Sequence, residues 1–413
     1  MTLGITQITP ILKELYNDQV VEDMVYKKNP FFAMVKKNEE FLGKNYPVPI
    51  KIGNVQGRSA TFGVAQAGGI ATSTIFAEFM VTRVANYSQA RIGNEAMLAS
   101  GGDKGSFVRG LKAEMDSAID QLARDISIGM YRSGNAEVGR VGSFATNTLT
   151  LAQTAEIVNF EVGQRYDVSA TLTGALRARG TSTNPLIVTG INRSTGVLTF
   201  GFNTADSTNG IPAIAGGDFL FPAGDHVAGV LTKIAGLAAW LPVDGVTATP
   251  FFTVDRTIDA TRLGGVSVVG TAAATISEAL FNASVAIARE GGAPDTCFLN
   301  FSNFNALIQS LSSSVVREDV QVGTIGFGSI VIDGPAGKIN VIADMNCPPG
   351  VAYLLQLDTW ELASLGKAVE LFKGDSLDMI RVPDSDALEL RVNSYANLIC
   401  TAPGFNGLVT LPL

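Results

Sequence analysis

The chain has 413 residues, of which 46% are hydrophobic and only 16% are charged, and its formal net charge is −8. This balance is too apolar for an intrinsically disordered protein, and an acidic chain without a long basic stripe is not a dedicated DNA-binding protein. There are 44 glycines. A surface this poor in charge suits a chain that covers much of itself with further copies.

The cysteines and apolar stretches indicate the compartment. An odd number of cysteines without framework spacing fits a reducing environment. The three cysteines are Cys297, Cys347 and Cys400. The apolar stretch at 227–243 is interrupted by Lys233 and Pro242 and is too short to span a bilayer, so we expect no membrane segment.

Residues 1–45 mix short helical patterns with breakers, which predicts an arm that packs on another surface. Its packing candidates are Phe31, Phe32 and Phe41. The arm also contains two lysine pairs, Lys27 with Lys28 and Lys36 with Lys37. Nearby glutamates and an aspartate nearly cancel their charge, so an arm that only packs on another surface is the alternative to a nucleic-acid contact.

Residues 46–92 predict a long β-hairpin. The segment 46–52 alternates, and Pro47 and Pro49 forbid a central position in a sheet. The tip between Gly57 and Gly69 is glycine-rich and almost uncharged, so we expect it to be flexible. Because a two-stranded ribbon is marginal in water, the hairpin needs a partner surface, either its own body or a neighbouring subunit.

The rest of the chain predicts an α+β protein with an inserted domain. Apolar residues at helical spacing predict one long helix over 104–133, and short strand candidates separated by glycines predict a small all-β barrel or sandwich over 147–225. Helices and strands interleave without regular βαβ units over 233–372. Residues 388–413 alternate as one or two strands broken at Pro403.

The sequence offers little catalytic chemistry. The single histidine, His226, follows Asp225 and is expected in a surface loop rather than in a catalytic dyad. One histidine and three scattered cysteines do not make a zinc site. The segment 334–338 has the lysine of a phosphate loop, but Ile332 and Ile339 replace residues that such a loop requires. We therefore expect no enzyme activity, no metal and no cofactor.

The order of these parts resembles that of the major capsid proteins of tailed bacteriophages, whose fold is the Hong Kong 97 type. The resemblance implies the following domains: N-terminal arm 1–45, extended loop 46–92, peripheral domain 93–146 with spine helix 104–133, inserted β domain 147–225, axial domain with connecting peripheral strands 226–378, and C-terminal strands 379–413 returning to the peripheral domain. The last segment includes Arg391-Val392 and Ala402-Pro403-Gly404-Phe405.

The resemblance also implies a function. Such a chain self-assembles as hexamers and pentamers into the icosahedral shell around the double-stranded DNA of a tailed phage, in the virion capsid, after assembly in the host cytoplasm. Portal, scaffold and decoration proteins are possible further partners. The extended-loop residues implied to contact another subunit are Lys51, Gly57, Arg58, Phe62, Gly63, Gly68 and Gly69.

Two departures from the family and one electrostatic feature refine this picture. The loop offers only Lys51 near its base, which disfavours the covalent cross-link of some relatives, and no charged helical leader precedes the arm, so we expect an uncleaved N-terminus. The lysines at 27, 28, 36 and 37 are candidates for a weak, salt-sensitive contact with packaged DNA on the inner face.

Three alternatives stay open at this stage. The first is an encapsulin-like cellular nanocompartment, which uses the same fold. The second is a β-rich surface or adhesion protein, which the missing export signal and the long helix disfavour. The third is an uncharacterised hydrolase, which lacks an evident base.

Overall fold

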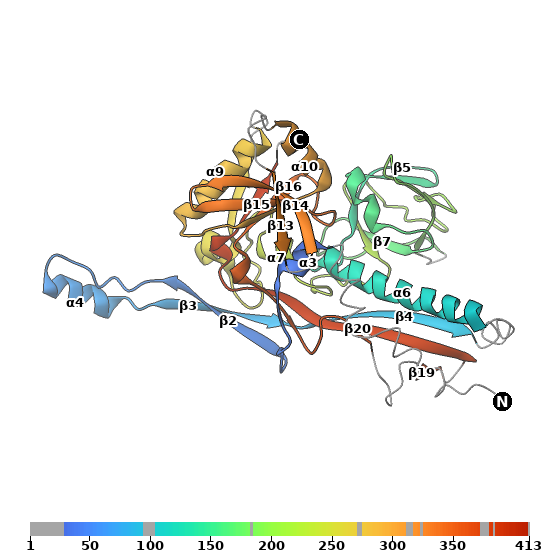
Figure 1. Ribbon diagram of the computed structural model, residues 1–413, viewed down its shortest axis with the longest axis horizontal. Coiled ribbons are helices and arrows are strands. Elements are labelled where there is room, and N and C mark those ends of the chain that lie inside the picture. Colours follow the sequence, from blue (N-terminus) through green and yellow to red (C-terminus); the bar gives the residue numbers. More distant parts are fainter. Residues whose placement is uncertain are drawn as a thin grey trace.

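The computed structural model describes residues 29–93, 104–181, 185–270, 275–310, 317–322, 325–371, 380–382 and 385–411. Figure 1 shows a central body of mixed sheet and helices with a small barrel beside it. Two long extensions run along the base of this body in opposite directions: a ribbon that ends in a short helix, and a long helix lying along two long strands.

The central body is built on a seven-stranded mixed sheet. Its strand β12 (Thr296–Leu299) is buried on both faces: Cys297 and Leu299 face one apolar cluster and Phe298 faces another, as the two-residue period of a strand requires. In spatial order the strands are β11 (Val266–Val269), β21 (Gly407–Thr410), β16 (Val351–Leu355), β12, β15 (Gly337–Ala343), β14 (Ile325–Gly334) and β13 (Arg317–Val322).

Two helices cover one face of this sheet. Helix α9 (Ile276–Arg289) starts in a capping box, in which the Thr275 hydroxyl accepts from the Glu278 N–H and the Glu278 carboxylate accepts from the Thr275 N–H. Its buried residues recur every three or four positions, which gives the helix one apolar side. The next helix, α10 (Phe301–Ser310), is started by Asn300, whose side-chain oxygen accepts from the Ser302 N–H at 3.1 Å.

A second sheet forms the base. Its central strand β20 (Ala387–Cys400) pairs along one side with β4 (Val84–Gly93). The other strands of this sheet are β1 (Lys36–Asn38), β17 (Trp360–Ser364), β18 (Glu370–Leu371) and β19 (Ile380–Arg381). Strand β20 belongs to this base sheet, whereas β21, the last described strand, pairs in the seven-stranded sheet, so the predicted C-terminal strands are divided between two sheets.

The long helix α6 (Lys104–Gly129) packs along β4. It ends at Gly129, earlier than the predicted residue 133, in a tighter turn in which the Tyr131 and Arg132 N–H groups each donate three residues back, at 3.1 Å. Just beyond this end, the Leu237 N–H donates to Met130 O at 2.7 Å and the Gly236 N–H to Arg132 O at 3.0 Å. A Cβ on Gly236 would lie 2.3 Å from Met130 O, so only glycine allows this approach.

Six antiparallel strands close into a barrel whose interior is filled by apolar side chains. The barrel begins at Gly139, before the predicted boundary at residue 147. In order around the barrel the strands are β10 (Phe219–Pro222), β5 (Gly139–Ala145), β6 (Thr148–Leu151), β9 (Val197–Phe200), β8 (Leu186–Asn192) and β7 (Arg165–Ser169).

The ribbon consists of β2 (Asn45–Gly53) paired antiparallel with β3 (Ile75–Thr82), and its tip forms helix α4 (Phe62–Ala71). The remaining short helices are α3 (Pro30–Met34), α7 (Leu237–Trp240), α8 (Ala260–Gly264), η1 (Thr154–Asn159), η2 (Arg256–Asp259), η3 (Leu357–Thr359) and η4 (Pro403–Phe405).

Asn397 joins three parts of the fold. Its side chain is fully buried in β20; Oδ1 accepts from the N–H groups of Ala235 and Leu398, each at 2.9 Å, and Nδ2 donates to Thr82 O at 2.7 Å. Since removal of the amide leaves buried backbone groups unpaired, we expect Asn397→Ala to lower the free energy of unfolding by about 3 kcal/mol. Denaturant unfolding of unassembled subunits measures this.

The matched control is Asn282→Ala on the exposed side of α9, which should change the free energy of unfolding by less than about 0.5 kcal/mol. Equal effects of the two substitutions would contradict the assigned role of Asn397.

Candidate assembly surface

The root of the ribbon is fixed to the central body by aromatic packing. Phe79 of β3 is fully buried, with its ring centroid 5.2 Å from that of Trp240 and 6.1 Å from that of Phe251. The Met80 N–H donates to Phe252 O at 3.0 Å, and the Arg262 guanidinium donates to Ile52 O. The direction in which the ribbon leaves the body is therefore set by this root.

A strained turn and a buried arginine complete the root. Phe252 and Thr253 have φ values of 44° and 77°, a left-handed conformation that is rare for large or β-branched residues. The Arg256 guanidinium lies 4.3 Å from the Phe251 ring centroid and donates to Ala239 O at 2.8 Å and Trp240 O at 3.2 Å. Burial lowers the pKa of Arg256 to about 10, so it is still charged at neutral pH and holds the turn as a cation.

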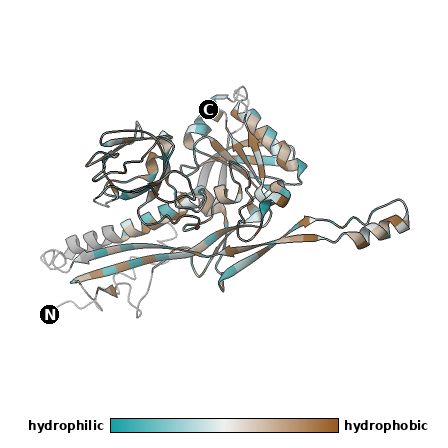
Figure 2. Cartoon of the chain, turned by 180° about the vertical axis from the view of Figure 1, so that it is seen from behind, coloured by the Kyte–Doolittle hydropathy of each residue, from teal (hydrophilic) through white to brown (hydrophobic). Residues whose placement is uncertain are grey.

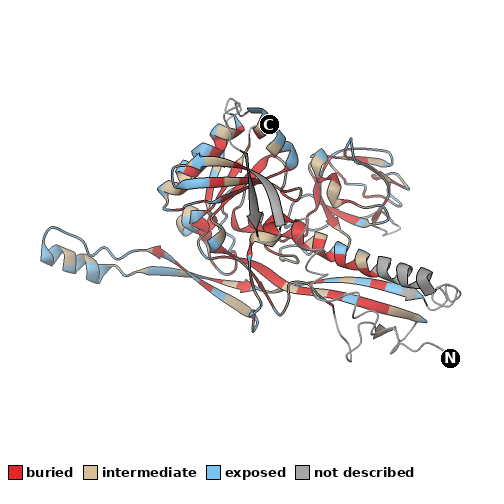
Figure 3. Ribbon diagram, viewed as in Figure 1, coloured by how far each residue is buried: buried red, intermediate tan, exposed pale blue. Residues whose placement is uncertain are grey.

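The tip of the ribbon has the opposite character. Helix α4 buries none of its residues, and Phe62 and Ile70 are 82% and 80% exposed. The far end of the ribbon is exposed in Figure 3 and carries hydrophobic segments in Figure 2. Other exposed large apolar residues there are Val55, Val64, Ile75 and Phe76, and the one charged residue between positions 54 and 77 is Arg58.

The tip is helical rather than the flexible glycine-rich loop expected from its sequence. The cause is close packing between α4 and the segment that precedes it. The Gln56 N–H donates to Thr72 Oγ1 at 2.7 Å, and a Cβ on Gly68 would lie 2.3 Å from Gln56 O. Gly68 is therefore needed for the approach of two backbones rather than for flexibility, a signal that the sequence alone does not separate from a loop.

The predicted extended-loop residues all lie on the ribbon and not in a cleft. Lys51 is exposed on β2, and Gly57 and Arg58 are exposed before α4. The others lie within α4: Phe62, Gly63, Gly68 and Gly69. Their contact with another subunit stays a prediction.

The predicted front-arm residues pack on their own body. Phe31, Phe32 and Phe41 belong to the largest apolar cluster of the chain. The Phe31 ring centroid lies 5.2 Å from that of Tyr131 and 5.1 Å from that of Phe298. The expectation that this part of the arm needs another surface is corrected for residues 29–42, since these three side chains are not available to a neighbouring copy in this conformation.

A buried carboxyl group holds the front arm. Asp344 accepts at Oδ2 from the Tyr131 hydroxyl at 2.8 Å and from the Phe31 N–H at 3.5 Å, and at Oδ1 from the Asn346 N–H at 2.9 Å. Burial raises the pKa of Asp344 above its usual value, although these hydrogen bonds oppose the shift.

The candidate lysines for DNA contact are only partly described. Lys27 and Lys28 lie outside the described residues. The Lys36 ammonium is exposed and lies 3.4 Å from Glu361 Oε2. Lys37 donates to Ala33 O at 2.9 Å and lies over the Phe32 ring, so it contributes to the packing of the arm.

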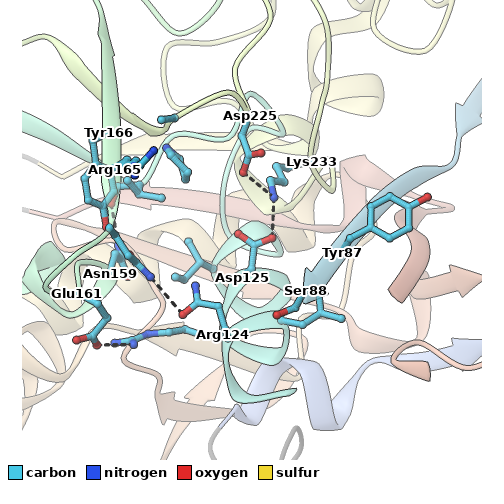
Figure 4. A pocket seen from close by; sticks show the side chains of 17 residues that line it. Tyr87, Ser88, Arg124, Asp125, Asn159, Glu161, Arg165, Tyr166, Asp225 and Lys233 are labelled. Carbon is cyan, nitrogen blue, oxygen red and sulfur yellow. Dashed lines mark hydrogen bonds and ion pairs between the residues drawn. The ribbon is translucent and has the colours of Figure 1, made fainter. Parts of the chain in front are cut away.

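Ion pairs fix the barrel, and the segment that follows it in the same chain, to α6. Arg124 of α6 bonds Glu161 at 2.6 Å, and Lys233 lies between Asp125 at 2.8 Å and Asp225 at 2.9 Å, around a cavity of about 320 Å³ (Figure 4). Burial by itself lowers the pKa of Lys233, but the two aspartates outweigh it and raise this pKa above the ordinary value. The contacts neutralise one another, so the junction is a structural joint and not a charged binding site.

The single histidine is buried, which corrects the expected surface loop. His226 Nδ1 lies 3.2 Å from Asn135 O and Nε2 lies 2.8 Å from Gly174 O, while its ring stacks on Phe221 at 4.1 Å. Asp225 bonds Lys233 instead, so the two residues form no dyad. Both ring nitrogens are occupied by backbone groups, and His226 has a structural role.

All three cysteines are free and buried. Burial raises the pKa of Cys400 to about 12 and raises the pKa of Cys297 and Cys347 as well. Within the described ranges, no group of three or more His, Cys, Asp or Glu could hold a metal ion. No helix among the residues that the structure describes is long and apolar enough to cross a membrane.

Comparison with known proteins decides between the open alternatives. Residues 199–377 match the model of the SU10 major capsid protein family. The capsid asymmetric unit of cyanophage A-1(L) aligns over 94% of both chains with 13% identity and a TM-score of 0.50. The chain has the fold of the tailed-phage major capsid proteins. Together with the family match, this confirms the predicted recognition, the α+β fold class and the shell-forming function.

Other similarities are weaker. A structure of Mycobacterium phage Cain aligns over 99% of this chain and 98% of that chain, with 10% identity and a TM-score of 0.41. An encapsulin complex of Synechococcus elongatus PCC 7942 aligns over 35% of this chain and 52% of that chain, with 11% identity and a TM-score of 0.27. No curated protein matches this sequence.

The raised pKa of Asp344 gives a pH-dependent prediction. Because the pKa of Asp344 is higher in the folded than in the unfolded chain, the folded chain binds more protons at this group once the pH exceeds about 4. The group therefore contributes stability that is lost as the pH rises through its folded-state pKa. We expect the free energy of unfolding of the wild type, relative to that of Asp344→Asn, to decrease as the pH is raised from 4 to 7. Denaturant unfolding of both proteins at each pH measures the difference.

Asp244→Asn, at an exposed position, is the matched control and should show no such trend. A wild-type advantage over Asp344→Asn that grows with pH would contradict the prediction.

Proposed function

We propose that this capsid protein self-assembles as hexamers and pentamers into the closed shell around the double-stranded DNA of a tailed phage, with the ribbon of each copy lying on a neighbour. The observation that supports this is the contrast along the ribbon. Its root is bound tightly to its own body, whereas its tip is a helix with no buried residue. A helix of this length is marginal in water unless an apolar face is covered.

The energetic argument favours a partner of the same kind. Covering one large apolar side chain stabilises a contact by about 1.5–3 kcal/mol, and the tip offers several. One such contact is weak after the cost of association, but a closed shell repeats it around every subunit. Permanent assemblies of this type bury thousands of Å² per subunit.

The finer assignments belong to the same proposal. We assign the domains given above, with the inserted β domain beginning at Gly139 instead of residue 147, the virion capsid as the location and the host cytoplasm as the place of assembly. The protein acts as a structural component and not as an enzyme. Packaged DNA is contacted weakly and without sequence preference by the arm lysines, of which Lys36 is the exposed described example. Portal, scaffold and decoration proteins are the further partners.

Charge placed on the tip tests the proposal. Phe62→Asp and Ile70→Asp should reduce the yield of closed particles at least tenfold, because a buried unpaired carboxylate is costly at the contact. The subunit itself should unfold at the same temperature as the wild type, since α4 buries nothing in its own chain. Electron microscopy and sedimentation measure the particles.

Val162→Asp is the matched control, because Val162 is an exposed apolar residue near the barrel, away from the ribbon. Normal particles from both tip variants would overturn the role of the tip.

A further inference from the structure

The two edges of the ribbon differ in hydrogen-bonding capacity. In the β2–β3 pair, Pro47 lies opposite Met80 and Pro49 opposite Glu78. Proline has no N–H, and directly opposed residues of an antiparallel pair either bond each other twice or not at all. The hydrogen bonds between β2 and β3 are therefore made by the alternate pairs, such as Val48 with Phe79. The backbone N–H and C=O groups at positions 45, 47, 49 and 51 point outward from β2, away from β3.

The outer edge of β2 is thus closed to another strand. Of its four outward positions, Pro47 and Pro49 have no donor, which leaves the N–H groups of Asn45 and Lys51 at the two ends. Prolines on an edge strand prevent pairing with other chains. A strand that added on this side would lose two adjacent ladder bonds.

The outer edge of β3 is open. By the same register its outward residues are Phe76, Glu78, Met80 and Thr82, and none of them is proline. Near the root this edge is already used: the Met80 N–H donates to Phe252 O, and Thr82 O accepts from Asn397 Nδ2 at 2.7 Å. Glu78 O also accepts from the Thr253 hydroxyl at 3.4 Å. The N–H groups of Phe76 and Glu78 point away from β2 by this register, and no hydrogen bond joins them to another described residue.

The side chains beside this open edge are large and apolar, as is usual for a strand that a neighbouring strand or surface covers. Phe76 is 66% exposed and its neighbour Ile75 is 57% exposed, on the two faces of the same strand. A strand that added beside Phe76 would cover both faces and satisfy the unpaired backbone groups in the same step. Edges that stay in solvent are normally short, charged or blocked; β2 is blocked by its two prolines, whereas this part of β3 has no proline and a single charge, at Glu78.

We propose that the outer edge of β3 at Phe76–Glu78 receives an extended strand from a second copy of this chain, so that the ribbon becomes a three-stranded sheet in the shell. The inference rests on the proposed function, because the shell supplies the second copy. It adds the type of contact, main-chain strand pairing, and the side of the ribbon on which the contact forms.

Amide hydrogen exchange of wild-type subunits and assembled particles tests the proposal without any substitution. On assembly, the amides of Phe76 and Glu78 should exchange at least tenfold more slowly, whereas that of Lys51, on the opposite edge, should change much less. Particles in which Phe76 and Glu78 exchange as in free subunits would overturn the inference and leave the proposed function intact. Equal protection of the Lys51 amide would contradict the assignment of the contact to the β3 edge rather than the β2 edge.

A pair of proline variants provides the second test. Glu78→Pro removes an outward N–H from the open edge, and Lys51→Pro removes one from the closed edge of the same ribbon. Glu78→Pro should lower the particle yield at least tenfold and Lys51→Pro should not, with unchanged thermal unfolding of both subunits. Equal yields would overturn the inference, whereas failure of the wild type itself to form particles under every assembly condition would overturn the proposed function.

Discussion

The packing of Phe79 against Trp240 and Phe251 is the contact on which the architecture depends. It holds a two-stranded ribbon, which is marginal by itself, at a fixed direction from the central body. The strained turn at Phe252 and Thr253 is tolerated because this cluster and the Arg256 cation surround it. An extended element that is rigid at its root can present its apolar tip at one place relative to the body, which repeated assembly requires.

The sequence predicts those elements whose apolar period matches their burial. The alternation of residues 46–52 predicts β2, in which the apolar residues Val48, Ile50 and Ile52 are buried and the residues between them are exposed. The recognition from the order of parts is confirmed for the same reason, since each part has its own local pattern. The end of α6 differs from the predicted residue 133: the helix stops at Gly129, and the carbonyl groups of Met130 and Arg132 just beyond it pair with a segment that is distant in sequence.

The remaining differences arise from tertiary contacts that composition does not reveal. Gly68 was interpreted as a source of flexibility, but it allows close packing against Gln56. The burial of His226 follows from two backbone carbonyl groups supplied by other segments. Phe31 was expected on another surface, and its actual position depends on Asp344, more than three hundred residues away. At the assembly surface, sequence identified the ribbon but could not distinguish its root from its tip.

The burial of all three thiols has a practical consequence for chemistry on the particle. Because Cys297, Cys347 and Cys400 are inside the fold and their thiolates are disfavoured, thiol-directed reagents have no native target on the folded subunit. A cysteine introduced at exposed Val162 would then be the sole reactive handle, at one defined point of each subunit. Fluorophores or peptides could be attached there in a repeating array without first replacing the native cysteines.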